Sequence, residues 1–109
     1  MIEPKPGEVL LSQPRGIAVS GYFSPFHHND QPWLIQMPNN PSYWLAVFSS
    51  VEKLEESCAD LGIRDYKIKQ ITDGRDFVES IIEQGVRIML DPYAVRSENK
   101  TRWTEVVLG

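Results

Sequence analysis

The chain has 109 residues, of which 41% are hydrophobic and 24% are charged, and its formal net charge is −4. This length suits one domain with its own core, and the composition excludes an intrinsically disordered or fibrous protein. The negative charge and the lack of clustered Lys and Arg argue against nucleic acid as a partner. The single cysteine, Cys58, excludes an intrachain disulfide and a metal site built from cysteines.

No stretch of the sequence predicts a membrane span or an export signal. The longest uncharged stretch, residues 31–51, is interrupted by three prolines, whereas a spanning helix needs about 20 mostly apolar residues. The first residues, MIEPKPGEVLL, lack the basic start and continuous apolar core of a signal peptide. We therefore expect a cytoplasmic protein with no membrane partner.

The two halves of the chain differ in composition. Residues 1–50 hold seven of the eight prolines and seven of the eleven aromatic residues. Such a segment cannot bury a core by itself, so we predict a single domain over residues 1–109. Its irregular aromatic and proline-rich part is residues 1–42, where 16–23 and 33–37 are candidate strands, and its regular part is residues 43–109.

The regular part begins with a strand and an amphipathic helix. Residues 43–48, YWLAVF, form an apolar run of strand length. Ser49 and Glu52 have the spacing of a capping box, which predicts a helix start. Apolar residues at helical spacing follow, and Gly62 suits the left-handed cap that ends a helix.

A second strand, a second helix and two further strands are predicted downstream. Residues 66–71 alternate as in a strand with one wet face, and residues 72–84 form a helix capped by Thr72 or Asp73. Residues 86–90, VRIML, form a buried strand that Asp91-Pro92 should end, because proline cannot continue the ladder. A polar turn then leads to a last strand at 102–108.

This order of elements predicts an α+β fold or a small α/β fold. We expect a single compact domain in which two helices pack on a mixed sheet of about four to six strands.

Part of this pattern resembles a known family. The runs WLAVFSSVEKLEES and GVRIMLDPYAV are similar to the SseB N-terminal-like domain over about residues 43–93. Members of that family show a strand ending in a Phe-x-Ser turn, an acidic helix, and a later strand closed by a proline turn. The resemblance implies an α/β fold, no established catalytic residues, and accessory or interaction roles. The first forty residues do not match, so a function located there would not carry over.

Both histidines lie in the segment FSPFHHND, residues 23–30. His27, His28 and Asp30 are the candidate metal ligands, because imidazole and carboxylate groups bind zinc. A zinc site needs three or four convergent ligands, and the sequence offers no fourth group at a recognisable spacing. Catalysis by histidine would need a nucleophile or a carboxylate pair, and neither is evident. We therefore predict a loop, with no catalytic residue, metal or cofactor.

Two groups of residues are candidates for binding a partner. Phe26 and Trp33 are flanked by prolines and polar residues, so we expect these aromatic rings to be exposed. Glu52, Glu55 and Glu56 lie on the wet side of the first predicted helix, which is either a solvated face or a contact for a basic protein.

These observations favour a non-enzymatic interaction or accessory protein of bacterial type, with an immunity-like or regulatory role as the concrete form. One alternative is a small metal-dependent or histidine-based enzyme that uses the 27–30 loop. A second alternative is a homodimeric structural subunit that pairs through an exposed strand, either around residues 67–70 or at the C-terminal end.

Overall fold

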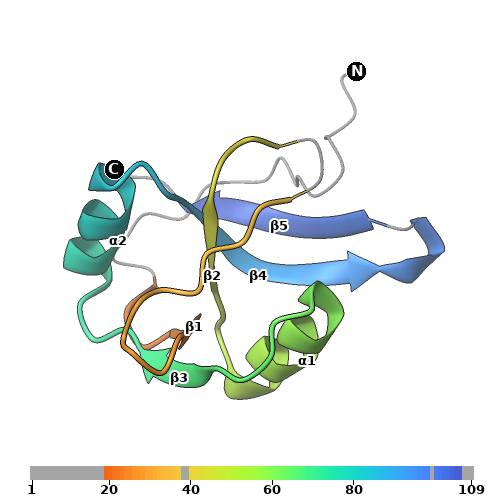
Figure 1. The fold of residues 1–109 in the computed structure, drawn as a ribbon, viewed down its shortest axis with the longest axis horizontal. Coiled ribbons are helices and arrows are strands. Elements are labelled where there is room, and N and C mark those ends of the chain that lie inside the picture. Colours follow the sequence, from red (N-terminus) through yellow and green to blue (C-terminus); the bar gives the residue numbers. More distant parts are fainter. Residues whose placement is uncertain (1–18, 38–39, 99, 107–109) are drawn as a thin grey trace.

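Two helices lie on opposite sides of a small central sheet in the computed structural model, which describes residues 19–37, 40–98 and 100–106 (Figure 1). These residues form one compact α+β domain, as the sequence predicts. Its elements in chain order are β1 (Phe23–Phe26), β2 (Trp44–Val47), α1 (Val51–Leu61), β3 (Lys67–Gln70), α2 (Gly74–Glu83), β4 (Arg87–Val95), the short 3-10 helix η2 (Arg96–Glu98) and β5 (Lys100–Val106).

The strands are divided between two sheets. β2 runs parallel to β4, and β5 pairs antiparallel with the other edge of β4, which makes a mixed three-stranded sheet. β1 and β3 form a two-stranded antiparallel sheet. Phe23 and Phe48 join the two sheets through a reciprocal pair of backbone hydrogen bonds, with N···O distances of 2.8 and 2.7 Å. The predicted fold class is confirmed, and the predicted strands are shared between two linked sheets.

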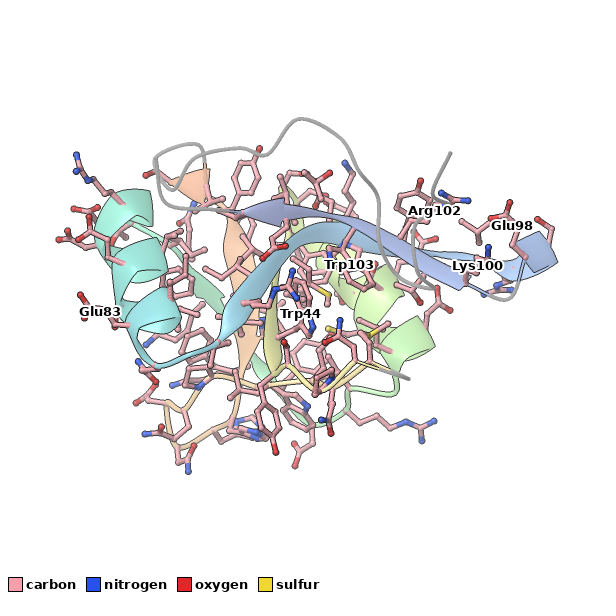
Figure 2. The ribbon with its side chains drawn as sticks, turned by 90° about the horizontal axis from the view of Figure 1, so that it is seen from above. Trp44, Glu83, Glu98, Lys100, Arg102 and Trp103 are labelled. Carbon is pink, nitrogen blue, oxygen red and sulfur yellow. The ribbon has the colours of Figure 1, made fainter. Side chains whose placement is uncertain are left out.

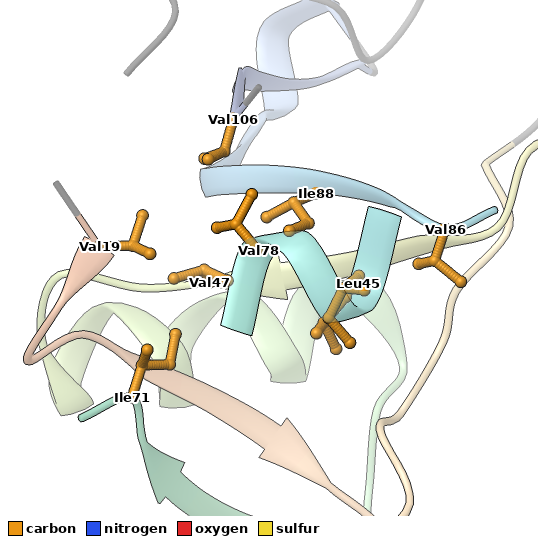
Figure 3. Packing of buried hydrophobic residues seen from close by; sticks show 9 residues of the cluster. Val19, Leu45, Val47, Ile71, Val78, Val86, Ile88 and Val106 are labelled. Atoms are coloured by element: carbon orange, nitrogen blue, oxygen red, sulfur yellow. The ribbon is translucent and has the colours of Figure 1, made fainter. Parts of the chain in front are cut away.

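The side chains of β2 alternate between two separate cores. Leu45 and Val47 pack with residues of α2, such as Val78, in a first hydrophobic cluster (Figure 3). Trp44 and the other alternate residues of β2 pack with residues of α1, such as Leu54, in a second cluster. Successive residues of a strand point to opposite faces of a sheet, so both faces of β2 are covered. This double burial explains why YWLAVF reads as a continuous apolar run.

The second cluster contains two tryptophans that come from different strands. The rings of Trp44 and Trp103 meet edge to face with their centroids 5.1 Å apart (Figure 2). The Arg87 guanidinium lies 4.3 Å from the centre of the Trp44 ring and forms a forked ion pair with Glu105, in which the N···O distances are 2.9 and 2.5 Å. The Trp44 indole N–H is buried and has no hydrogen-bond partner among the described residues.

Local signals place both helices correctly, with one correction. Asp73 caps α2 by accepting a hydrogen bond from the Asp76 N–H, and Gly62 ends α1 in the left-handed region with φ 76°. The expected capping box at Ser49 is wrong, because Ser50 is the residue that caps α1, and it accepts a hydrogen bond from the Lys53 N–H. Ser49 is engaged elsewhere.

The prediction that the segment FSPFHHND is a loop is wrong for its first four residues, which form β1. Pro25 lies opposite Ile68 of β3, but its carbonyl oxygen accepts a hydrogen bond from the Trp33 N–H, on the other side of the strand. In an antiparallel ladder, alternate residues direct their amide groups to opposite sides. The missing N–H of Pro25 therefore faces away from β3, and the ladder accepts a proline.

β4 continues through Asp91-Pro92, where the sequence predicts its end. Leu90 pairs with Thr104 and Tyr93 with Arg102, so three steps along β4 oppose two along β5 and form a bulge. Asp91 lies in the left-handed region with φ 48°. Pro92 lies within this bulge, and β4 continues beyond it.

Two hydrogen bonds hold the Asp91 carboxylate, and both come from Ser49. The Ser49 N–H donates to Oδ1 at 2.8 Å, and the Ser49 hydroxyl donates to Oδ2 at 2.9 Å. The Ser57 hydroxyl on α1 donates to the Pro92 carbonyl oxygen. The bulge is therefore fixed to the start and the middle of α1. Beyond it, the β4–β5 hairpin extends past α1 (Figures 1 and 2).

Four further strand predictions differ from the structure or lie partly outside the described residues. β3 exists, but its expected apolar face is wrong, since Ile68 is 38% exposed. Residues 33–37 form only an isolated bridge between Ile35 and Trp44, and residues 16–18 of the first candidate strand lie outside the described residues. The last strand ends at Val106, and the predicted residues 107–108 also lie outside the described part.

Within the described residues, neither helix is long and apolar enough to cross a membrane.

Candidate functional site

One face of α1 carries exposed negative charge. Glu52, Glu55 and Glu56 are all exposed, as predicted, and lie three and four residues apart. At these spacings side chains are neighbours, and like charges destabilise a helix by roughly 0.2–0.5 kcal/mol per pair. None of the three forms an ion pair with a described residue. This set of three residues, the acidic face, carries charge that the described part of the chain does not neutralise.

The acidic face borders a groove of about 570 Å³ between α1 and the bulge of β4. Lys53, Glu56 and Asp60 line the groove from α1. Asp91 and Tyr93 line it from β4. Because the hydrogen bonds from Ser49 and Ser57 fix the bulge on α1, the two walls of the groove are held in one arrangement.

Two ion pairs connect the walls of the groove. The Lys53 ammonium lies 3.7 Å from the Asp91 carboxylate, and the Arg96 guanidinium lies 3.3 Å from the Asp60 carboxylate. The Lys53 and Arg96 side chains are 60% and 87% exposed, and exposed pairs of this kind contribute about 0–1 kcal/mol. These two ion pairs therefore add little to the stability of the groove.

Tyr93 is an exposed aromatic side chain at the same groove. It is 52% exposed, although it lies within β4. Exposed tyrosines are enriched in protein interfaces, since they bury a large area with little loss of side-chain entropy. Sequence reasoning missed Tyr93, because the expected end of the strand at Pro92 left it in an unassigned segment.

The loop after β1 directs its two histidines to different neighbours. The His27 ring stacks on the Trp33 ring, with their centroids 4.1 Å apart and their planes inclined by 20°. The His28 Nε2 atom lies 3.0 Å from an Asp65 carboxylate oxygen. Each ring therefore has its own local partner.

Asp30, the third candidate metal ligand, is surrounded by lysines. Its carboxylate is bonded to the Lys67 ammonium, and the Lys69 ammonium lies 3.9 Å away. The hydrogen bond from Lys67 holds the pKa of the Asp30 carboxyl below its ordinary value. Among the described residues, no group of three or more His, Cys, Asp and Glu side chains is placed to hold a metal ion.

The two aromatic candidates differ from expectation. The predicted exposure of Phe26 is wrong, because β1 buries this side chain and leaves 7% of it exposed. Its ring lies 6.5 Å from the Phe77 ring of α2, a contact that the polar neighbours of Phe26 in the sequence do not reveal. Trp33 is half-buried against the second hydrophobic cluster, and His27 covers one side of its ring.

Cys58 is buried on the inner side of α1, where the sequence places it. Burial raises the pKa of its thiol to about 11, although a hydrogen bond with Tyr66 acts in the opposite direction. Burial and the neighbouring thiol likewise raise the pKa of the Tyr66 hydroxyl. The thiolate is the reactive form of cysteine, so this environment makes Cys58 a poor nucleophile at neutral pH.

Comparison of the chain with protein-family models, with curated proteins and with solved structures gives no match. The similarity of residues 43–93 to the SseB N-terminal-like domain therefore stays a prediction.

Proposed function

We propose that this chain is a non-enzymatic accessory protein that binds a basic protein through the acidic face of α1 and the adjoining groove. The concrete form of this role is that of an immunity-like or regulatory partner. The observation that carries the proposal is the exposed charge of Glu52, Glu55 and Glu56 on one side of a single helix, which no described residue neutralises through an ion pair. The role that the predicted family resemblance implies agrees with this proposal.

The negative charge of the acidic face favours association with a cationic protein surface. Complementary charge steers two proteins toward each other and raises the association rate, an effect that salt weakens. A cationic partner also removes the repulsion among neighbouring glutamates that the free helix bears. Tyr93 supplies an aromatic contact beside the charges, and such residues often carry much of the energy of an interface.

A capture experiment with charge-reversed variants tests the proposal. The tagged protein, its Glu55→Lys/Glu56→Lys variant and an Asp76→Lys/Glu83→Lys control are incubated with lysate of the source organism, and bound proteins are identified by mass spectrometry. The control makes the same change in net charge at exposed positions of α2. We expect a basic protein to be retained by the wild type and by the control, and to be lost with the α1 variant.

The captured protein is then purified, and its association rate constant is measured at increasing salt. Steering by the acidic face predicts that the rate constant falls as salt rises, and that the α1 variant has a lower rate constant and a weaker salt dependence. A partner that binds all three proteins equally, or an association rate that salt does not change, would overturn the proposal.

A further inference from the structure

A second concave site shares no lining residue with the groove beside the acidic face. It is a pocket of about 400 Å³ between α2 and the β1–β3 sheet, and none of its lining residues belongs to α1. Ligand sites for small molecules have volumes of about 300–1,000 Å³ and combine an apolar lining with a few polar groups. The pocket has a volume in this range, and its lining combines five apolar residues with seven polar or charged residues.

Apolar side chains from three parts of the chain form the inner surface of this pocket. Phe26 comes from β1, Ile71 follows β3, and Phe77 and Ile81 come from α2. Ile71 and Ile81 belong to the first hydrophobic cluster, so the pocket opens directly onto the packed core. Phe26, Ile71 and Ile81 are at most 7% exposed, so the half-buried Phe77 and Pro32 offer most of the apolar surface that a ring or a branched apolar body could cover.

A loosely paired lysine at one side of the pocket can receive an anionic group. Lys67 and Lys69 share the single carboxylate of Asp30, and Lys67 is its closer partner. Asp30 and Lys69 both line the pocket, and the Lys69 ammonium lies 3.9 Å from the Asp30 carboxylate and 4.8 Å from the centre of the Phe26 ring. An anionic group attached to an apolar body can approach Lys69 while the body contacts Phe26.

The remaining charged residue of the lining is Asp73, which is the N-cap of α2. Its carboxylate accepts a hydrogen bond from the Asp76 N–H and caps the helix. The N-terminus of a helix carries about half a positive charge, which offsets part of the charge of a capping carboxylate. Lys69 is therefore the lining cation that an anionic ligand group would contact.

We propose that the pocket between α2 and the β1–β3 sheet binds a small molecule that joins an aromatic or apolar body to one anionic group.

Two probes of the same shape and opposite charge test this proposal. Phenylbutyrate and phenylbutylamine are titrated separately into the full chain, and backbone amide NMR spectra follow binding and its location. We expect saturable binding of phenylbutyrate with shifts at residues of α2 and β3, and binding of the amine about fivefold weaker, since one exposed ion pair contributes up to about 1 kcal/mol.

Substitutions at the pocket separate the roles of charge and shape. Lys69→Gln should weaken phenylbutyrate binding about fivefold, while Lys69→Arg should retain it. Ser80 is an exposed lining residue of α2, so Ser80→Glu should weaken the anion and strengthen the amine, whereas the neutral control Ser80→Gln should change both probes alike. The amide spectra report in the same experiment that each variant is folded.

Three outcomes would overturn the proposal: no saturable binding of phenylbutyrate, equal affinity for the two probes, or shifts located away from α2 and β3. The acidic face takes no part in these measurements, so their result is independent of the proposed protein partner.

Discussion

Asp91 combines a strained backbone conformation with hydrogen bonds to a residue far away in the sequence. Its backbone is left-handed, and its carboxylate accepts both hydrogen bonds from Ser49. Left-handed backbone is unfavourable for most residues other than glycine, although Asp and Asn tolerate it better. The contacts with Ser49 therefore hold the bulge in a conformation that the local sequence alone would not favour.

We expect Asp91→Ala to lower the free energy of unfolding by about 2 kcal/mol, because it removes two hydrogen bonds and leaves a left-handed alanine. Asp91→Asn should lower it by less than about 1 kcal/mol, since an amide can accept from the Ser49 N–H and donate to its hydroxyl. Urea unfolding of the two variants and the wild type gives the comparison. Equal losses for Ala and Asn would show that the Ser49 contacts do not stabilise the bulge.

Cys58 gives a second prediction at the residue scale. The folded thiol has a pKa of about 11, raised from 9.0 by burial. We expect no reaction with dithionitrobenzoate in the native protein at neutral pH and rapid reaction in denaturant. A native thiol that reacts at the denatured rate would contradict the burial of Cys58.

The same shift predicts how stability depends on pH. The unfolded thiol loses its proton near pH 9, while the folded thiol keeps its proton until about pH 11. The thiol therefore favours the folded state fully below pH 9, and this contribution is lost as pH rises toward 11. Unfolding free energies measured across this range should fall more steeply for the wild type than for Cys58→Ala. Parallel curves would contradict the raised pKa.

At the scale of the element, Glu55 of α1 carries a charge that does not stabilise the helix. Glu52 and Glu55 are neighbours of like charge, so Glu55→Lys creates a favourable pair at the same spacing. We expect this change to raise the free energy of unfolding by about 0.3 kcal/mol. Thermal and urea unfolding test this, with the conservative Glu55→Gln as control. A loss above about 1 kcal/mol would show that Glu55 supports the fold, and would make Glu55→Lys unsuitable for the capture experiment.

The elements that the sequence predicts correctly are those fixed by near neighbours. Asp73 caps α2 through an amide three residues away, and Gly62 ends α1 through its own backbone. The bulge in β4 depends on Ser49, which lies 42 residues from Asp91, so no local pattern around Asp91-Pro92 reveals it. The burial of Phe26 could not be predicted for the same reason, because Phe77, whose ring it contacts, lies far from it in the sequence.

The sequence likewise predicts one part of the candidate site and does not predict the rest. Helical spacing alone places Glu52, Glu55 and Glu56 on one exposed side, so the acidic face is predictable. The groove beside it needs the bulge to bring Tyr93 opposite α1, and the pocket on α2 needs β1 to pair with β3. Both of these sites arise from tertiary contacts that periodicity does not contain.

At the scale of the whole molecule, the two hydrophobic clusters share the strands between them. Leu45 and Ala46 are adjacent in β2 and belong to different clusters. The loss of one cluster therefore removes support from the strand that carries the other. We expect cooperative unfolding in a single transition.

Matched truncations in the two clusters test this coupling. Leu54→Ala in the cluster under α1 and Ile81→Ala in the cluster under α2 should each lower the free energy of unfolding by about 3 kcal/mol. Tryptophan fluorescence, which reports on Trp33, Trp44 and Trp103 at the cluster under α1, should shift to lower urea with Ile81→Ala as much as the far-ultraviolet circular dichroism does. Separate midpoints for the two signals would show that the clusters unfold independently.

The placement of α1 and α2 on opposite faces of the central sheet has a consequence for ligand competition. A protein held on the acidic face would leave the pocket beside α2 open to solvent, and a small anion in that pocket would leave α1 uncovered. The two proposed ligands would therefore occupy one molecule together, as a ternary complex. An inhibitor directed at either surface would not displace the ligand on the other.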